Sequence, residues 1–249
     1  MIEVEQHGEV AVIAFANGKV NAIDVALLRD LQASLQSLAD EPSVGSVILT
    51  GTGRTFSAGL DLRQLVEGGK DYVSTLLAEL GGALTLVFSY PKPTVAAING
   101  AAVAGGCIVA AACDARLMAQ DARIGATELS VGVTFPVEAL EILRHTCGRH
   151  TESVVFGARL LDPHEAIALG LVDEIVAPEE LTERAMLRAN QLGSLPAEAY
   201  RLTKEQLRRP ALERMRSSAE GGSAATTFWQ SPETIDRVRA QLERLSARG

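Results

Sequence analysis

PTVAAINGAAVAGGCIVAAACD, residues 93–114, is the stretch that decides the fold. Its β-branched start, Thr94 to Ile98, is typical of a buried strand, and Asn99-Gly100 predicts a tight turn. The run of Ala, Gly, Val, Ile and Cys that follows predicts a buried helix, which begins near Gly105-Gly106 and ends near Asp114. Such a helix has no polar face, so the rest of the chain must surround it.

The two glycines at the start of this helix point to an anion site made of main chain. The first N–H groups of a helix have no partner within it, and the positive end of the helix dipole lies behind them. Small residues such as Gly105 and Gly106 let a ligand approach this backbone closely. From the segment alone, close packing of a central helix explains the two glycines equally well.

Size and charge restrict the classes of function. With 249 residues, 47% hydrophobic and 22% charged, the chain suits one large domain or one domain with a small extension. Lys and Arg number 23 against 31 Asp and Glu, and the net charge of -8 argues against nucleic-acid binding. Basic residues gather in 201–216, where a solvated helix face explains them better than a phosphate contact does.

The cysteines and histidines do not suggest a disulfide framework or a metal site. Cys107 and Cys113 lie inside the apolar helix and Cys147 lies further along, so all three are expected to be small core residues in a reducing compartment. The four histidines show no ligand-like spacing with Cys or Asp, and we expect no metal.

The N-terminal segment enters an alternating strand pattern directly, without the basic start and apolar block of a signal peptide. Residues 95–113 are long and apolar enough to consider as a membrane span, but Asn99 and glycines interrupt them, which favours a buried soluble core. We therefore expect a cytoplasmic protein with no membrane partner.

Strands and helices alternate through the first two thirds of the chain, and helices alone follow. Strands are predicted at 2–6, 10–15, 44–50, 116–119, 123–125 and 171–176. Helices are predicted at 24–39 with Asp24 as N-cap, at 62–89 with a break at Gly81-Gly82, and at 136–145, 197–208, 210–220 and 232–247. This order predicts an α/β core, residues 1–195, with a helical C-terminal region, residues 196–249.

The loop after residue 50 contains GTG, which invites a dinucleotide-binding interpretation. That fingerprint needs a third glycine three residues after Gly53, and the chain has Phe56 there. The hypothesis of a nicotinamide cofactor therefore loses its main support.

Three segments together resemble the crotonase family, also called the enoyl-CoA hydratase/isomerase superfamily. They are FSAGLDL at 56–62, INGAAVAGGC at 98–107 and IGATELSVGV at 124–133. The resemblance extends from residues 19–22 to residues 241–245. It implies an α/β fold with a crotonase-like ββα superhelix core and a C-terminal helical trimerisation region, and it implies a homo-trimer or hexamer.

The resemblance implies an oxyanion hole for an acyl-CoA thioester. The backbone N–H groups of Ala58 and Gly105 are expected to bind the thioester oxygen, in agreement with the helix that opens at Gly105. Two donors aimed at developing charge stabilise an enolate. Coenzyme A is part of the substrate in this scheme, and no separate cofactor is expected.

The carboxylates decide which reaction is expected. Hydratases of the family use two glutamates, and the matching positions here hold Ile108 and Glu128. Hydration asks for one group to activate water and another to deliver a proton, and Ile108 can do neither. Moving a double bond from the 3 to the 2 position needs one base. AGGCIVAAACD at 104–114, IGATELSVGV and FSAGLDL most resemble the mitochondrial-type Δ3,Δ2-enoyl-CoA isomerases, and this resemblance implies Glu128 as acid/base. Apolar neighbours of Glu128 are expected to raise its pKa.

Further site residues follow from the resemblance alone. Those expected along the CoA nucleotide are Lys19, Asn21 and Ala22, and those expected at the pantetheine or pocket mouth are Ser57, Asp61 and Leu62. Asp61 is alternatively only a helix N-cap. Phe228 and Trp229 are either near a subunit boundary or ordinary core aromatics, with equal weight.

Two further functions stay open beside isomerisation. One is other acyl-CoA chemistry on the same oxyanion hole, namely hydration or thioester hydrolysis with Glu128. The other is a protein that binds acyl-CoA without turnover. The length and structure of the acyl chain do not follow from the sequence.

Overall fold

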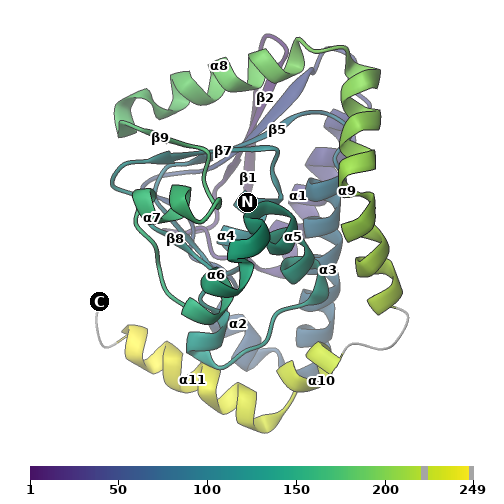
Figure 1. The fold of residues 1–249 in the computed structure, drawn as a ribbon. Coiled ribbons are helices and arrows are strands. Elements are labelled where there is room, and N and C mark those ends of the chain that lie inside the picture. The colour runs from purple at the N-terminus through teal and green to yellow at the C-terminus, as the bar shows by residue number, and fades with distance from the viewer. Residues whose placement is uncertain (220–223, 247–249) are drawn as a thin grey trace.

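The computed structural model describes residues 1–219 and 224–246, and its centre is a six-stranded sheet (Figure 1). The order of the sheet is β1-β2-β3-β5-β7-β9, in which β1 is antiparallel to β2 and the other neighbours are parallel. The strands are β1 Ile2–His7, β2 Val10–Phe15, β3 Ser46–Gly51, β5 Thr94–Ile98, β7 Ala115–Ala119 and β9 Glu174–Val176. These positions confirm the predicted strands, although β9 begins three residues later than residue 171.

A second, smaller sheet positions the site. Its parallel strands are β4 Thr55–Ser57, β6 Ala101–Val103 and β8 Ile124–Gly125. Each directly follows a strand of the large sheet, in the pairs β3 and β4, β5 and β6, and β7 and β8. The ends of the three short strands therefore lie side by side, and the loops that leave them converge. The sequence did not predict β4 or β6, because three residues are too few for a period of two to show.

Helices cover both the sheet and the converging loops (Figure 1). They are α1 Val25–Ala39, α2 Leu62–Glu67, α3 Gly69–Ser89, α4 Gly105–Ala112, α5 Val137–Cys147, α6 Thr151–Gly157, α7 Pro163–Ala168, α8 Leu181–Gly193, α9 Ala197–Ala219, α10 Ala224–Trp229 and α11 Pro232–Ser246. Short 3-10 helices are η1 Glu128–Val131, η2 Gly148–His150 and η3 Pro178–Glu180.

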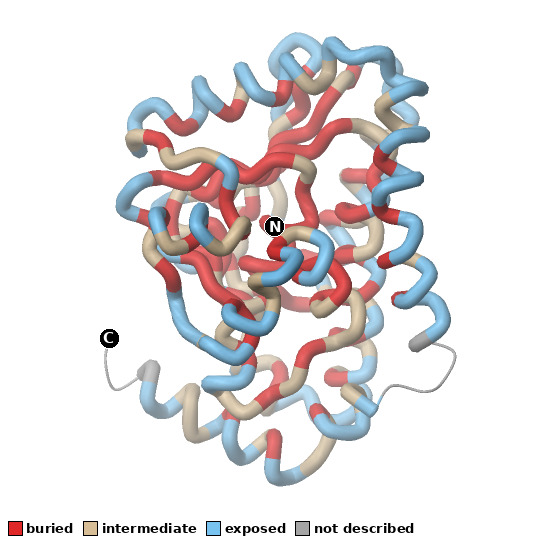
Figure 2. Tube along the Cα trace, in the orientation of Figure 1, coloured by how far each residue is buried: buried red, intermediate tan, exposed pale blue. Residues whose placement is uncertain are grey.

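Helix α4 lies in the middle of the molecule, as its composition predicted. All eight of its residues are buried, and it contacts α3, α5 and β6. Figure 2 shows that the buried chain is concentrated in the sheet and in the helices around α4, while α8 and α9 present an exposed face to solvent. Cys107, Cys113 and Cys147 are all buried and unpaired, which confirms them as small core residues.

The predicted break at Gly81-Gly82 is wrong, because α3 continues through both glycines. The break in this region lies instead between α2 and α3, at Gly68 and Gly69, where Gly69 has φ +70. A Cβ on Gly81 would lie 3.1 Å from Oε1 of Glu138, and a Cβ on Gly82 would lie 3.0 Å from Oε1 of Gln32. The glycine pair therefore makes room for side chains of neighbouring helices without interrupting the helix.

By length and composition, α3 is the one helix in the described part of the chain that could cross a membrane, with a mean hydropathy of 1.4 over its most apolar window. Half of that window is buried in the fold, where α3 contacts α1, α4 and α5. The core helix of a soluble protein passes the same test, so this helix is weak evidence for a membrane span.

The C-terminal helices differ from the prediction. One helix, α9, runs through Pro210, where two helices had been expected. One stripe of α9 is buried on both sides of the proline, namely Lys204, Arg208, Ala211 and Met215. Helix α10 was not predicted, and the predicted helix ends at Glu220 and Ala247 lie outside the described residues.

Candidate active site

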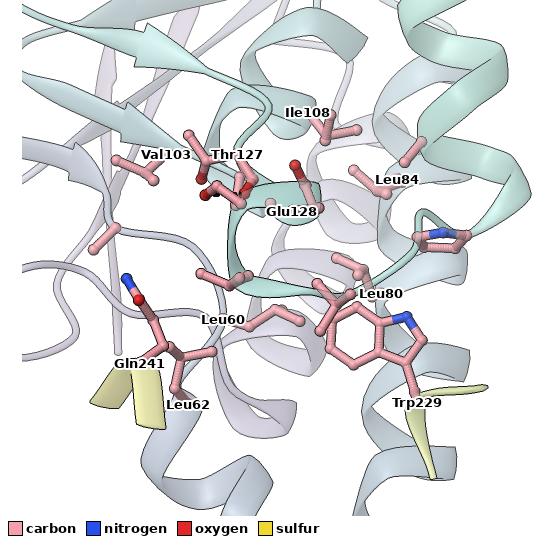
Figure 3. A pocket seen from close by; sticks show the side chains of 18 of the residues that line it. Leu60, Leu62, Leu80, Leu84, Val103, Ile108, Thr127, Glu128, Trp229 and Gln241 are labelled. Carbon is pink, nitrogen blue, oxygen red and sulfur yellow. Dashed lines mark hydrogen bonds between the residues drawn. The ribbon is translucent and has the colours of Figure 1, made fainter. Parts of the chain in front are cut away.

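The three converging loops and the C-terminal helices enclose a cavity of about 380 Å³ (Figure 3). Loop residues 58–62 follow β4, residues 103–105 lead from β6 into α4, and residues 127–133 follow β8. Leu80 and Leu84 of α3, Trp229 of α10 and Gln241 of α11 complete the wall. The wall is mostly apolar, as is typical of a small-molecule site with a few placed polar groups.

Gly105 and Gly106, at the start of α4, have different structural roles. A Cβ on Gly106 would lie 2.7 Å from the carbonyl oxygen of Ser57 and 2.8 Å from its Cβ, so Gly106 permits α4 to pack closely on β4. A Cβ on Gly105 would meet Cδ1 of Ile23 at 3.4 Å, an ordinary contact, and Gly105 lines the cavity. Close packing therefore explains Gly106, while Gly105 leaves its backbone open to a ligand.

The backbone N–H groups of Leu60 and Gly105 lie at the cavity, and neither has an acceptor among the described residues. Gly105 is the first residue of α4, where the helix itself supplies no partner. The loops that carry the two groups are in contact, because a Cβ on Gly59 would lie 2.8 Å from the carbonyl oxygen of Val103 and 3.5 Å from N of Gly105. Gly59 has φ +85, so only glycine suits both its conformation and this approach.

The structure contradicts the expectation that Ala58 supplies a donor. The N–H of Ala58 donates to the carbonyl oxygen of Val20 at 2.9 Å. Residues 20–23 run beside residues 58–61. In the parallel bridge between Ile23 and Leu60, the N–H of Ile23 donates to the carbonyl oxygen of Gly59, and the N–H of Asp61 donates to the carbonyl oxygen of Ile23. The N–H of Leu60 therefore faces away from Ile23.

The residue that enters α4 has a strained backbone. Ala104 has φ 48 and ψ -119, a conformation that residues with a side chain rarely adopt, and its N–H donates to the carbonyl oxygen of Gly125 at 2.8 Å. Ala104 also lines the cavity beside Gly105. Such outliers cost on the order of 1–3 kcal/mol and persist where the surrounding structure imposes them, often at functional sites.

Glu128 is the only charged side chain among the described residues that line the cavity. It lies at the start of η1, is 7% exposed, and its Oε2 has no hydrogen-bond partner. Burial raises the pKa of this carboxyl from its ordinary 4.5 to about 7, against the weaker opposite effect of a hydrogen bond from its own backbone N–H. A buried carboxyl of this pKa with one oxygen free of hydrogen bonds is suited to taking and returning a proton near neutral pH.

Ile108 also lines the cavity, and Figure 3 shows it near Glu128 and Leu84. It is 1% exposed, so its side chain fills space that a second carboxylate would need. The polar groups that do reach the cavity are Thr127, Ser130 and Gln241, which carry no charge.

The remaining predicted residues are spread over the surroundings of the cavity, and Leu62 alone among them lines it. Lys19 is exposed, and the carbonyl oxygen of Ala22 accepts a bond from Asn17 at 2.7 Å. Asp61 caps α2, since its carboxylate accepts from the N–H groups of Arg63 and Gln64.

Asn21 and Ser57 are fully buried and support the loops. The amide of Asn21 donates to the carbonyl oxygens of Thr52 and Thr55, at 3.1 and 2.8 Å. The hydroxyl of Ser57 donates to the carbonyl oxygen of Asn21 at 2.8 Å and accepts from the N–H of Gly59 at 3.2 Å. Both side chains therefore fix the loop that carries Leu60 and do not face the cavity.

Sequence reasoning missed the wall that comes from distant helices. It placed neither Leu80, Leu84 nor Gln241 in the site, and it named Trp229 only as a boundary or core aromatic. An apolar residue on a buried helix gives the same pattern whether it faces the core or a cavity, so no local signal could have separated them. Among the described residues, no group of three His, Cys, Asp or Glu is placed to hold a metal ion.

Comparisons with known proteins show the family of this chain. The family model for enoyl-CoA hydratase/isomerase matches residues 5–239. A putative enoyl-CoA hydratase of Thermus thermophilus is 36% identical over 212 residues, 83% of this chain and 83% of that protein. The human mitochondrial enoyl-CoA delta isomerase 1 is 30% identical over 250 residues, 98% of this chain and 83% of that protein.

Solved structures with names from the same family are similar to this chain over nearly its whole length. The crystal structure of the human mitochondrial delta3-delta2-enoyl-CoA isomerase is similar with a TM-score of 0.95 at 30% identity, over 99% of this chain and 98% of that one. An enoyl-CoA hydratase from Bacillus halodurans is similar with a TM-score of 0.87 at 25% identity, over 96% of this chain and 99% of that one. The chain belongs to the enoyl-CoA hydratase/isomerase family, the crotonases.

Proposed function

We propose that this protein is an enoyl-CoA isomerase, which converts a 3-enoyl-CoA into the 2-trans-enoyl-CoA with Glu128 as its single acid/base. The observation that carries the proposal is a cavity with one carboxylate, Glu128, whose Oε2 is free of hydrogen bonds, and with Ile108 where a second carboxylate would lie. The match to an isomerase over 98% of the chain supports it, and so does the TM-score of 0.95 with the human isomerase structure.

In this proposal the thioester oxygen accepts hydrogen bonds from the N–H groups of Leu60 and Gly105. Leu60 takes the donor role that the sequence predicted for Ala58. Both groups lack an acceptor among the described residues and lie at the cavity. Two such donors are aimed at the oxygen on which negative charge develops, and removing one donor of this kind costs about 2.7–4 kcal/mol in a measured enzyme.

The reaction needs one proton to move and no net exchange of atoms. The Glu128 carboxylate takes a proton from C2, and the electron pair of that C–H bond forms the C1–C2 double bond of a dienolate whose charge rests on the thioester oxygen. The carboxylic acid then returns a proton to C4, the C2–C3 double bond forms, and the thioester carbonyl is restored. A base that lies between C2 and C4 can do both steps.

Turnover of trans-3-hexenoyl-CoA by wild type and by Glu128→Gln tests the proposal. We expect wild type to form 2-enoyl-CoA and Glu128→Gln to lose about 10²–10⁴ of the rate, the usual contribution of general acid–base catalysis. Glu138→Gln, on α5 outside the cavity, is the matched control and should retain the rate. Equal rates for wild type and Glu128→Gln would rule out Glu128 as the base.

Hydration is the second candidate, because relatives at similar identity are named enoyl-CoA hydratases. Ile108→Glu distinguishes the two reactions. If the missing carboxylate is what prevents hydration, this variant gains hydratase activity that wild type lacks.

Thioester hydrolysis would appear as release of free CoA, and a binding protein would show saturable binding without product.

Assembly and location also stay proposals. The family resemblance suggests a homo-trimer or hexamer, and we propose a cytoplasmic location. Coenzyme A enters as part of the substrate.

A further inference from the structure

Trp229 is the only tryptophan of the chain, and it lines the proposed active site. It is 3% exposed, and its indole N–H donates to the carbonyl oxygen of Thr134 at 2.9 Å, in the loop before α5. The next residue, Gln230, donates to the carbonyl oxygen of Lys70 at 3.1 Å and to the hydroxyl of Ser74 at 2.6 Å, both on α3. The indole is therefore held in place from two sides.

The part of the cavity that Trp229 closes is apolar. Figure 3 shows the indole beside Leu80, on the other side of Glu128 from Val103 and Thr127. Other apolar residues that line the cavity are Leu84, Val133, Pro136 and Ala139. A charged acyl group would lose its hydration there without gaining a partner, which is costly.

The direction of the acyl chain follows from the proposed function, on which this inference rests. With the thioester oxygen at the N–H groups of Leu60 and Gly105 and with C2 and C4 at Glu128, the apolar part of the cavity at Leu80 and Trp229 is left for the later carbons. The cavity of about 380 Å³ holds about a dozen non-hydrogen atoms at ~30 Å³ each, the volume of a water molecule in the liquid. The thioester and the end of the pantetheine use part of this space, so about eight chain carbons remain.

We propose that Trp229 is the end wall of the acyl site and determines chain length, so that the substrates are CoA esters of uncharged aliphatic acids up to about eight carbons. Trp229 is a specificity-determining residue in this account, because the terminal carbons of the chain contact its indole.

The fluorescence of this single tryptophan tests the proposal without turnover. Saturated butanoyl-, hexanoyl-, octanoyl- and dodecanoyl-CoA are titrated, with free CoA as control. We expect butanoyl-CoA and CoA to leave the emission unchanged while they compete for binding. Octanoyl-CoA should shift the emission, because its last carbons displace water at the indole. An emission change that is the same for all chain lengths would overturn the proposal.

Chain-length selectivity gives the second test. In Trp229→Leu, the ratio of kcat/KM for trans-3-dodecenoyl-CoA to that for trans-3-hexenoyl-CoA should rise at least about tenfold, since one methylene in an apolar pocket changes discrimination by about 10–200-fold. Ala139→Leu should lower the ratio of octenoyl- to hexenoyl-CoA. Phe228→Leu, beside Trp229 but outside this cavity, is the control and should keep the wild-type ratio.

The outcomes separate this inference from the proposed function. Trp229→Phe, which loses the bond to Thr134 but keeps most of the bulk, should keep the preference for short chains. An unchanged ratio in both Trp229→Leu and Ala139→Leu would overturn the end-wall role even if wild type is a good isomerase. If wild type isomerises no chain length, the proposed function fails, and the fluorescence series still decides where the chain ends.

Discussion

The carboxyl of Glu128 makes the proposed reaction dependent on pH in a stated direction. Burial raises its pKa to about 7, and the ionised form is the one that takes the proton from C2. We expect kcat/KM to be level above about pH 7 and to fall about tenfold per unit below it, as for one essential base in the free enzyme. Initial rates between about pH 5 and pH 9 measure this, and a profile that is flat across the range would contradict it.

The same residue should weaken the fold at neutral pH. A pKa of about 7 in the fold against 4.5 in the unfolded chain means that the folded state holds the proton more tightly. The stabilising effect is present below about pH 4.5 and is lost as pH rises through about 7. Glu128→Gln should therefore gain stability relative to wild type as pH rises, by up to about 3 kcal/mol at 1.36 kcal/mol per pKa unit. Urea unfolding at about pH 5 and pH 8 tests this, and a constant difference between the two proteins would count against a buried charge.

Helix α4 depends on the absence of a side chain at Gly106. Gly106→Ala places a methyl group 2.7 Å from a backbone oxygen of β4, so the two elements must separate, at a cost of about 1–3 kcal/mol for overpacking. Gly105→Ala is the matched control, since its methyl group meets Ile23 at 3.4 Å. We expect it to keep its stability and to lose activity, because the methyl group enters the cavity. Thermal unfolding and turnover of both variants test this, and equal loss of stability would contradict it.

Helix α9 is attached to the core by a buried group of charges. Asp114 accepts from Nζ of Lys204 at 2.7 Å, pairs with Arg208 at 2.7 Å and accepts from the N–H of Thr94 at 2.8 Å. Asp114→Ala leaves two buried cations without their anion and should cost about 3–5 kcal/mol, as when one partner of a buried pair is removed. Denaturation by urea measures the loss. Asp236→Ala, which breaks an exposed pair with Arg239, is the control and should leave the midpoint unchanged.

The elements that could be predicted are those with a strong local pattern. Helix α4 and strand β5 follow from one apolar stretch, and α1 follows from its leucine stripe and from Asp24, which caps it. Strands β4 and β6 have three residues each and show no period. The continuity of α9 through Pro210 depends on burial against helices far away in the chain.

The residues of the candidate site likewise include some that the sequence could predict and some that it could not. Gly105, Glu128 and Ile108 were placed correctly at the cavity, because each lies in a motif that is read locally. Ala58 was wrong as a donor, since the direction of an N–H in that loop is determined by pairing with residues 20–23. Trp229 could not be recognised as cavity wall, because its position depends on bonds to Thr134 and, through Gln230, to α3.

At the scale of the whole molecule, the site is formed by segments that are far apart in the sequence and adjacent in the fold. The ends of β4, β6 and β8 bring together residues more than sixty positions apart, and α10 and α11 cover them by packing on α3, α2 and η1. The C-terminal region thus supplies part of the wall of the cavity that holds Glu128.

The most direct test of a one-carboxylate site compares two rates of the wild-type protein. Isomerisation of trans-3-hexenoyl-CoA and hydration of trans-2-hexenoyl-CoA are measured under the same conditions, because the two reactions share the oxyanion hole and differ in the number of carboxylates they need. We predict rapid isomerisation with hydration slower by about 10²-fold or more, the lower range of what one acid–base group contributes. Hydration as fast as isomerisation would contradict the account, since Glu128 alone would then be doing the work of two groups.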